Sequence, residues 1–130
     1  MRVLLDTNAV SGLLRGNAGL GRSIRSASEL VFSSVVVGEL LHGYRAGKRY
    51  EKNLSVLRRL LAQPFVELRD VTFETAETYG RIQSQLQGDG TPLPTNDVWI
   101  AAQAIEAGAE LWTFDRHFQG IAGLAWRHLV

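Results

Sequence analysis

Four carboxylates lie at positions that a parallel α/β fold would bring to one edge of its sheet. They are the residues of this chain most suited to catalysis or metal binding. Asp6 follows the apolar run 3–5, and Asp115 follows the later apolar run "LWT". In open parallel sheets the functional crevice lies beyond the carboxyl ends of the strands. Each of these acids alone has an ordinary alternative role, because Asp is also common in loops and at helix N-termini.

Two further acids lie near the starts of expected helices, on the side of each helix that should face the sheet. Asp97 shares a helical stripe with Ile100 and Ala101, and Glu39 lies beside Leu40 in the same way. An acid near a helix N-terminus gains about 0.3–1 kcal/mol from the helix dipole, which explains an exposed acid better than one aligned with packed residues. We therefore expect both side chains to point inward, toward the other two acids.

A cation is the simplest explanation for such a group of acids. Carboxylates gathered without a counter-ion repel one another, and their pKa values rise. Mg²⁺ or Mn²⁺ relieves this repulsion, because hard cations prefer carboxylate and water oxygens. Sites of this kind favour phosphodiester hydrolysis. The chain has no cysteine, and His42, His117 and His128 lack the spacing of a zinc site, so we expect these histidines on the surface.

The expected elements alternate along the chain in a way that would bring the acids together. Strands are expected at residues 3–5, 29–34, 65–68 and 110–114, with a last, edge-like strand at 124–130. Helices are expected at residues 7–15, 19–27, 35–46, 48–62, 72–87 and 95–107. Ser33 or Ser34 can cap the third helix, Thr95 is expected to cap the last one, and Gly108 follows its end. This alternation predicts a three-layer α/β/α fold with a mainly parallel central sheet.

Length and composition are those of one globular domain covering residues 1–130. The chain is 45% hydrophobic and 21% charged, which is enough to bury a core without disulfides. It shows no signal-peptide pattern and no apolar run long enough for a membrane span, so we expect a cytoplasmic protein without a membrane partner. With a net charge of +1, nucleic-acid binding would need a local basic patch. The stretch 45–52 could supply one, although a solvated helix face is the ordinary alternative.

The motifs that carry the acids resemble those of the PIN-domain ribonucleases, and among them the VapC-type toxins of toxin–antitoxin pairs. "LLDTNAV" resembles the opening strand and acid, "VVVGELLHG" the second motif, and "PLPTNDVWIAAQAIEAGAELWTFDRHFQGIAGL" the C-terminal block. The resemblance runs nearly end to end, and all four acids of the family pattern are present. It implies a Mg²⁺- or Mn²⁺-dependent endoribonuclease that acts on RNA such as transfer or ribosomal RNA. It also implies a homodimer, and hetero-oligomers with a cognate VapB-type antitoxin that inhibits the enzyme.

Carried onto this chain, the resemblance assigns the catalytic and metal-binding roles to Asp6, Glu39, Asp97 and Asp115. Asp6 and Asp97 are expected to contact the metal directly. Glu39 either binds the metal or orients one of its waters, and Asp115 completes a second, weaker site.

Polar neighbours of these acids are expected to hold the carboxylates in place by hydrogen bonds. These residues are Thr7, Asn8, Asn96 and Thr113. Ordinary capping and turn formation is the alternative role for each of them. Arg15 and Arg116, together with the stretch 45–52, are expected to contact RNA phosphates, which would position the substrate without selecting its sequence.

Two other classes of protein compete with the nuclease interpretation. A phosphotransfer module also places Asp after its first strand. Phosphatases of that class need a second Asp where this chain has Asn8, and a receiver domain needs a late lysine, whereas Lys48 and Lys52 are the only lysines. The second alternative is a PIN-like module that binds RNA or protein without cleaving it. Loss of one or two acids would have indicated such a module, and none is missing.

Overall fold

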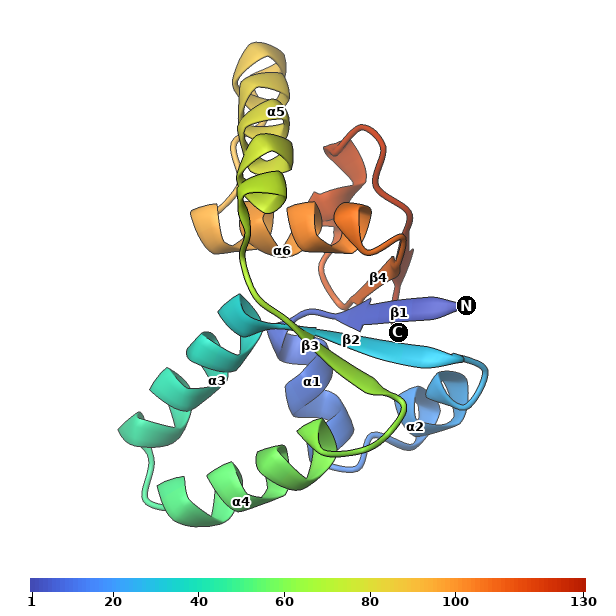
Figure 1. Cartoon of the computed structure of the whole chain (residues 1–130), viewed down its shortest axis with the longest axis vertical. Helices are drawn as coiled ribbons and strands as arrows, with labels where there is room; N and C mark the ends of the chain where they lie inside the picture. Colours follow the sequence, from blue (N-terminus) through green and yellow to red (C-terminus); the bar gives the residue numbers. More distant parts are fainter.

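A computed structural model describes residues 1–130 and shows an alternation of strands and helices (Figure 1). The elements are β1 (Arg2–Leu5), α1 (Thr7–Leu14), α2 (Ala18–Ile24), β2 (Glu29–Ser33), α3 (Ser34–Ala46), α4 (Tyr50–Leu61), β3 (Val66–Arg69), α5 (Phe73–Asp89), α6 (Thr95–Glu106), β4 (Glu110–Thr113), the 3₁₀ helix η1 (Arg116–Gly120) and β5 (Trp126–His128). All the expected strands and helices are present, and η1 is the one element that was not predicted. None of the helices combines the length and apolar content needed to cross a bilayer.

The five strands form one sheet in the order β3-β2-β1-β4-β5, and every neighbouring pair is parallel. β1 is the central strand: Leu4 is paired with Val31 of β2 on one side and with Leu111 of β4 on the other. The predicted, mainly parallel sheet is thus entirely parallel, with β5 at one edge as expected. Because all strands run in the same direction, their carboxyl ends meet at one side of the molecule.

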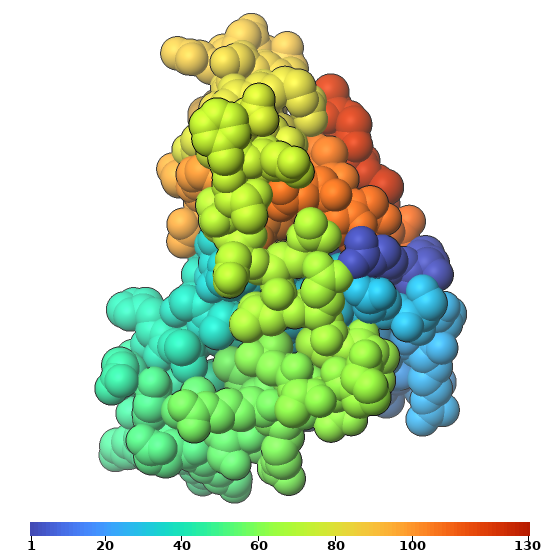
Figure 2. Space-filling model, viewed as in Figure 1, coloured from blue at the N-terminus to red at the C-terminus, as the bar shows by residue number.

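Helices cover both faces of this sheet and complete the three layers. Figure 1 shows α1 to α4 on one face and α5, α6 and η1 on the other. The strand β3 lies at the free edge, and Figure 2 shows this yellow-green segment at the surface. Phe65 and Leu68 at this edge are about half exposed. The predicted three-layer α/β/α architecture is confirmed.

The central strands and α6 form the middle of the core. Leu4 and Leu5 of β1 and Trp112 of β4 are fully buried. On α6, Ile100 and Ala101 are fully buried as well, so the stripe that the sequence predicted does face the sheet. Asp97 lies one turn before this packed stripe, which brings its carboxylate to the top of the core.

Two strand-to-helix junctions are closed by side-chain caps. Asp6 is the N-cap of α1, and its Oδ1 accepts a hydrogen bond from the backbone N–H of Ala9 at 3.0 Å. Ser33 is the N-cap of α3, and its hydroxyl accepts from the backbone N–H of Val35 at 3.0 Å. These caps start each helix directly after its strand, so polar side chains gather where the strands end.

The expected cap of α6 and the expected end of α2 were wrong in detail. The N-cap of α6 is Pro94 rather than Thr95, which is the first residue of the helix. Pro94 has φ −54° and extended ψ 139°, and its carbonyl oxygen accepts from the backbone N–H of Asp97 at 3.1 Å. The α2 helix ends at Ile24 because the next turn tightens, with the N–H of Ala27 bonded to the carbonyl of Ile24 at 3.0 Å.

Candidate active site

The carboxyl side of the sheet opens into a cavity of about 490 Å³ that contains all four predicted acids. Asp6 directly follows β1 and Asp115 lies two residues after β4, and these strands are neighbours in the sheet. Glu39 comes from α3, which follows β2, and Asp97 comes from the first turn of α6. The all-parallel sheet therefore brings together acids that are as much as 109 positions apart, since Asp6 and Asp115 both line the cavity.

Asp6 is the most enclosed of the four acids, and its carboxylate is held by two hydrogen bonds. Its Oδ1 caps α1 through Ala9, and its Oδ2 accepts from the Thr113 hydroxyl at 2.5 Å. The same hydroxyl accepts from the backbone N–H of Asp115 at 2.9 Å. Burial raises the pKa of Asp6, the bonds from Thr113 and Ala9 lower it, and the Asp115 charge raises it. Two hydrogen bonds thus fix the orientation of the Asp6 carboxylate, and its surroundings shift its pKa in opposite directions.

Glu39 is oriented by the residue that follows Asp6 in the chain. The Thr7 hydroxyl donates to Glu39 Oε1 at 2.6 Å and links the start of α1 to α3. Asn8 and Asn96 also line the cavity, but both are exposed and neither bonds to an acid through its amide. Of the four polar neighbours predicted to hold the carboxylates, the structure places two on them, Thr7 and Thr113.

His117 lies between two of the acids, and its expected place on the surface was wrong. Its Nε2 is 3.0 Å from Asp97 Oδ2, and its Nδ1 is 3.0 Å from Asp115 Oδ2. The reason is η1, which turns the chain back after β4 and packs the buried Phe118 against the core. The spacing of an acid at 115 and an apolar residue at 118 is the signal in the sequence that could have revealed this turn.

The other two histidines lie outside the cavity. His42 is exposed on α3, as expected. His128 is half-buried on β5, where its Nε2 lies 3.1 Å from the carbonyl oxygen of Phe114, so its expected exposure was wrong as well. His117 is therefore the only histidine that lines the acidic cavity.

Asp97 lies within the influence of all three other acids and of His117. Its burial raises its pKa, the neighbouring His117 lowers it, and the charges of Glu39, Asp6 and Asp115 raise it. A carboxylate that responds to three other acids lies within their common electric field. The cavity is thus a concentration of negative charge in which His117 is the one nearby group of opposite potential charge.

The donor set fits a hydrated divalent cation, although no three His, Asp or Glu side chains are placed to hold one ion together. Mg²⁺ commonly retains several waters and takes only one or two carboxylates from the protein. The buried Nε2 of His117 has no hydrogen-bond partner, because its contact with Asp97 lacks hydrogen-bond geometry. A cation between these groups would satisfy the nitrogen and offset the burial and the repulsion that raise the pKa of Asp97.

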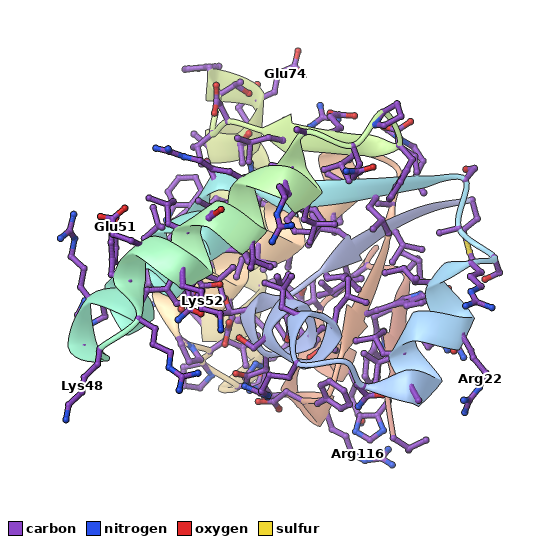
Figure 3. All side chains as sticks on the ribbon, turned by 90° about the horizontal axis from the view of Figure 1, so that it is seen from below. Arg22, Lys48, Glu51, Lys52, Glu74 and Arg116 are labelled. Carbon is purple, nitrogen blue, oxygen red and sulfur yellow. The ribbon has the colours of Figure 1, made fainter.

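The predicted RNA-contacting residues lie in two separate places. Arg15 lines a second cavity of about 460 Å³ beside α1, together with Arg49 and Lys52 from the basic stretch 45–52. Arg116 is exposed at the start of η1, and Figure 3 shows it well separated from Lys52. The structure therefore brings Arg15 together with the basic stretch and leaves Arg116 apart from both.

This fold is that of the PIN-domain family. The family model for the PIN domain matches residues 3–124, and the chain belongs to this family. The chain is similar to Ribonuclease VapC1 of Haemophilus influenzae (strain R2866), with 27% identity over an alignment of 132 positions that covers 98% of this chain and 97% of that protein. It is also similar to the tRNA(fMet)-specific endonuclease VapC of Salmonella typhimurium (strain LT2), with 27% identity and 95% of each chain covered.

Solved structures of related complexes share the whole fold. The chain is similar to VapBC2 from Rickettsia felis bound to a DNA fragment from its promoter, with a TM-score of 0.89, 25% identity and 100% of both chains covered. It is likewise similar to VapBC-1 from nontypeable Haemophilus influenzae, with a TM-score of 0.87, 26% identity and 98% of both chains covered. The predicted family and fold class are confirmed.

Proposed function

We propose that this chain is a metal-dependent endoribonuclease and the toxin of a toxin–antitoxin pair. The observation that carries the proposal is the convergence of Asp6, Glu39, Asp97 and Asp115 on one cavity at the carboxyl side of a parallel sheet. The similarity to proteins named Ribonuclease VapC supports RNA as the substrate. The similarity to VapBC complexes supports a VapB-type antitoxin as the partner.

The chain's own residues would supply the oxygen ligands of the cation. Asp6 and Asp97 would hold Mg²⁺ or Mn²⁺ directly, Glu39 would bind the ion or orient one of its waters, and Asp115 would complete a second, weaker site. Thr113 sets the direction of the Asp6 carboxylate, as Thr7 does for Glu39. When bound, the divalent cation would activate water and stabilise the leaving oxygen of the phosphodiester.

Substrate and assembly follow the same proposal. We assign RNA of the translation machinery, transfer RNA or ribosomal RNA, as the substrate class, since one similar relative is a tRNA(fMet)-specific endonuclease. The whole chain, residues 1–130, would work as one PIN domain in the cytoplasm. It would form a homodimer and, with the antitoxin, a hetero-oligomer.

A cleavage assay tests the enzyme. Purified, antitoxin-free protein is incubated with total RNA and either Mg²⁺ or Mn²⁺, with EDTA as one control and Asp97→Asn as another. We expect discrete products, and a loss of at least about 100-fold in rate for Asp97→Asn, because removal of a metal contact costs more than the 10–100-fold typical of an outer-shell change. Asp89→Asn, an exposed acid at the end of α5, is the matched control and should cleave like the wild type.

The alternative is a PIN-like module that binds RNA or protein without nuclease activity. A folded protein that binds RNA but neither binds Mg²⁺ or Mn²⁺ nor cleaves any RNA in the pool would favour that module and reject the nuclease. If RNA is cleaved, the sequences at the ends of the products would identify the RNA target.

A further inference from the structure

His117 is held in its place in the acidic cavity by contacts within its own turn. Its backbone N–H donates to Asp115 Oδ1 at 3.0 Å, and its Nδ1 lies 3.0 Å from Asp115 Oδ2. On the next residue, the buried ring of Phe118 lies with its centroid 4.6 Å from that of the imidazole. The Asp115 carboxylate therefore accepts a hydrogen bond from the main chain of His117 and lies in ion-pair contact with its ring.

The opposite nitrogen of the same ring faces Asp97. Nε2 is buried, has no hydrogen-bond partner, and lies 3.0 Å from Asp97 Oδ2. Two ligand atoms at right angles around one ion, with bonds of about 2.1 Å, stand about 3.0 Å apart. A separation of 3.0 Å fits a ligand pair as well as a hydrogen bond, but the missing hydrogen-bond geometry and the unpartnered nitrogen favour two neighbouring ligands of one cation.

The whole arrangement matches a recurrent pattern in metalloproteins. A histidine that binds a metal through one ring nitrogen usually directs the other toward a carboxylate, which fixes its tautomer and orientation. Asp115, His117 and Asp97 are arranged in this order: Asp115 Oδ2 is an ion-pair contact of Nδ1 at 3.0 Å, and Asp97 lies on the Nε2 side.

We infer that His117 Nε2 is a nitrogen ligand of the catalytic cation beside Asp97, and that Asp115 is a positioning residue that orients the imidazole. This inference rests on the proposed metal-dependent nuclease. It changes the expected role of Asp115 from completing a second metal site to acting through His117. A nitrogen ligand also makes the site selective among metal ions, because imidazole suits first-row transition ions better than Mg²⁺. The site should therefore prefer Mn²⁺ to Mg²⁺.

Pulsed electron paramagnetic resonance of bound Mn²⁺ tests the bond directly. In the wild-type full chain loaded with one equivalent of Mn²⁺, we expect ¹⁴N modulation from a coordinated imidazole. His117→Gln should abolish this modulation. His42→Gln, which removes an exposed imidazole on α3, should keep it. The wild-type spectrum alone is decisive: Mn²⁺ bound without ¹⁴N modulation overturns the inference, whatever the stability of the variants.

Titrations with Mn²⁺ and Mg²⁺ supply a second readout that does not depend on cleavage. We expect His117→Gln to lower Mn²⁺ affinity by at least about 10-fold, and Asp115→Asn by about 10–100-fold as an outer-shell change. Mg²⁺ affinity should change less in His117→Gln than Mn²⁺ affinity does. Equal losses for both ions would overturn the proposed preference.

The two proposals can fail separately in these experiments. RNA cleavage with Mn²⁺ that depends on Asp97, but without ¹⁴N modulation, would leave the nuclease standing and reject the role of His117. Absence of both Mn²⁺ binding and cleavage would reject the nuclease, and the role of His117 with it.

Discussion

The Thr113 hydroxyl donates a 2.5 Å hydrogen bond to Asp6 Oδ2, joining two residues that are 107 positions apart in the chain. The bond is possible because β1 and β4 are neighbours in the sheet, with Leu5 paired to Trp112. The same hydroxyl accepts the backbone N–H of Asp115. One buried side chain therefore sets the position of two acids, and support of this kind usually tunes the affinity of a metal site.

Thr113→Val tests this support, since it keeps the shape of the side chain and removes the hydroxyl. Loss of a hydrogen bond to a charged group should lower the free energy of unfolding by about 1.5–3 kcal/mol. Mn²⁺ affinity should fall by about 10–100-fold. Urea unfolding and a Mn²⁺ titration measure the two effects. Thr113→Ser retains the hydroxyl and is the control. If the valine and serine variants bind Mn²⁺ equally well, the hydroxyl has no part in holding Asp6.

The stability of the metal-free protein should depend on pH through Asp6 and Asp97. Burial is the largest cause that raises both pKa values above the ordinary 3.8. Above that value the folded protein binds more protons than the unfolded chain, so the contribution of these acids to the free energy of unfolding falls as the pH rises. Urea unfolding in EDTA from about pH 4 to about pH 7 should show this fall.

Asp97→Asn should flatten the pH dependence, because the amide does not ionise. Asp89→Asn, at an exposed acid, should leave it unchanged. Addition of Mn²⁺ at neutral pH should raise the free energy of unfolding of the wild type but not that of Asp97→Asn. A pH profile of Asp97→Asn that superimposes on the wild-type profile would argue against a raised pKa of Asp97 in the folded protein.

Gln103 is a buried polar residue whose hydrogen bonds join α6 to two strands. Its amide nitrogen donates to the carbonyl oxygen of Arg69 at 3.1 Å, and its amide oxygen accepts from the Ser33 hydroxyl. Gln103→Leu should lower the free energy of unfolding by about 1–3 kcal/mol for each partner left unpaired. Thermal or urea unfolding measures the loss. The exposed Gln87→Leu on α5 should change stability by less than about 0.5 kcal/mol, and an equal effect in both variants would contradict the assigned role of Gln103.

The cavity beside α1 should bind RNA phosphate through Arg15 and its basic neighbours. On the cleavage-deficient Asp97→Asn background, Arg15→Gln should lower the affinity for RNA regardless of the RNA sequence. It should also reduce the slope of log affinity against log salt by about 0.7–0.9, the value for one lost phosphate contact. Filter binding or fluorescence anisotropy at several salt concentrations measures the slope. Arg22→Gln, an exposed arginine on α2, is the control, and an identical slope in both variants would exclude a specific contact by Arg15.

Local patterns were sufficient for the element types and for much of the core. The unbroken apolar run predicts β1 because a central parallel strand is buried on both faces. The helical stripe predicts α6 because one face of that helix is buried. Ser33 was correctly placed among the candidate caps of α3, since capping involves only neighbouring residues. The cap of α6 was wrong because Pro94, with its extended ψ, can itself precede the first turn of a helix. The short turn η1 was missed because five residues are too few to establish a period.

By itself, the sequence determined that four acids follow strands or begin helices, because strand ends and helix starts are marked by residues next to one another in the chain. Their convergence was predicted from the expected parallel sheet, but only the tertiary structure decided the strand order that puts them in one cavity, since that order depends on long-range packing that no local pattern encodes. The same is true of His117 and Gln103. Their side chains find Asp97 and Ser33 only after η1 and α6 have packed on the sheet, and a single sequence carries no signal for contacts between residues so far apart.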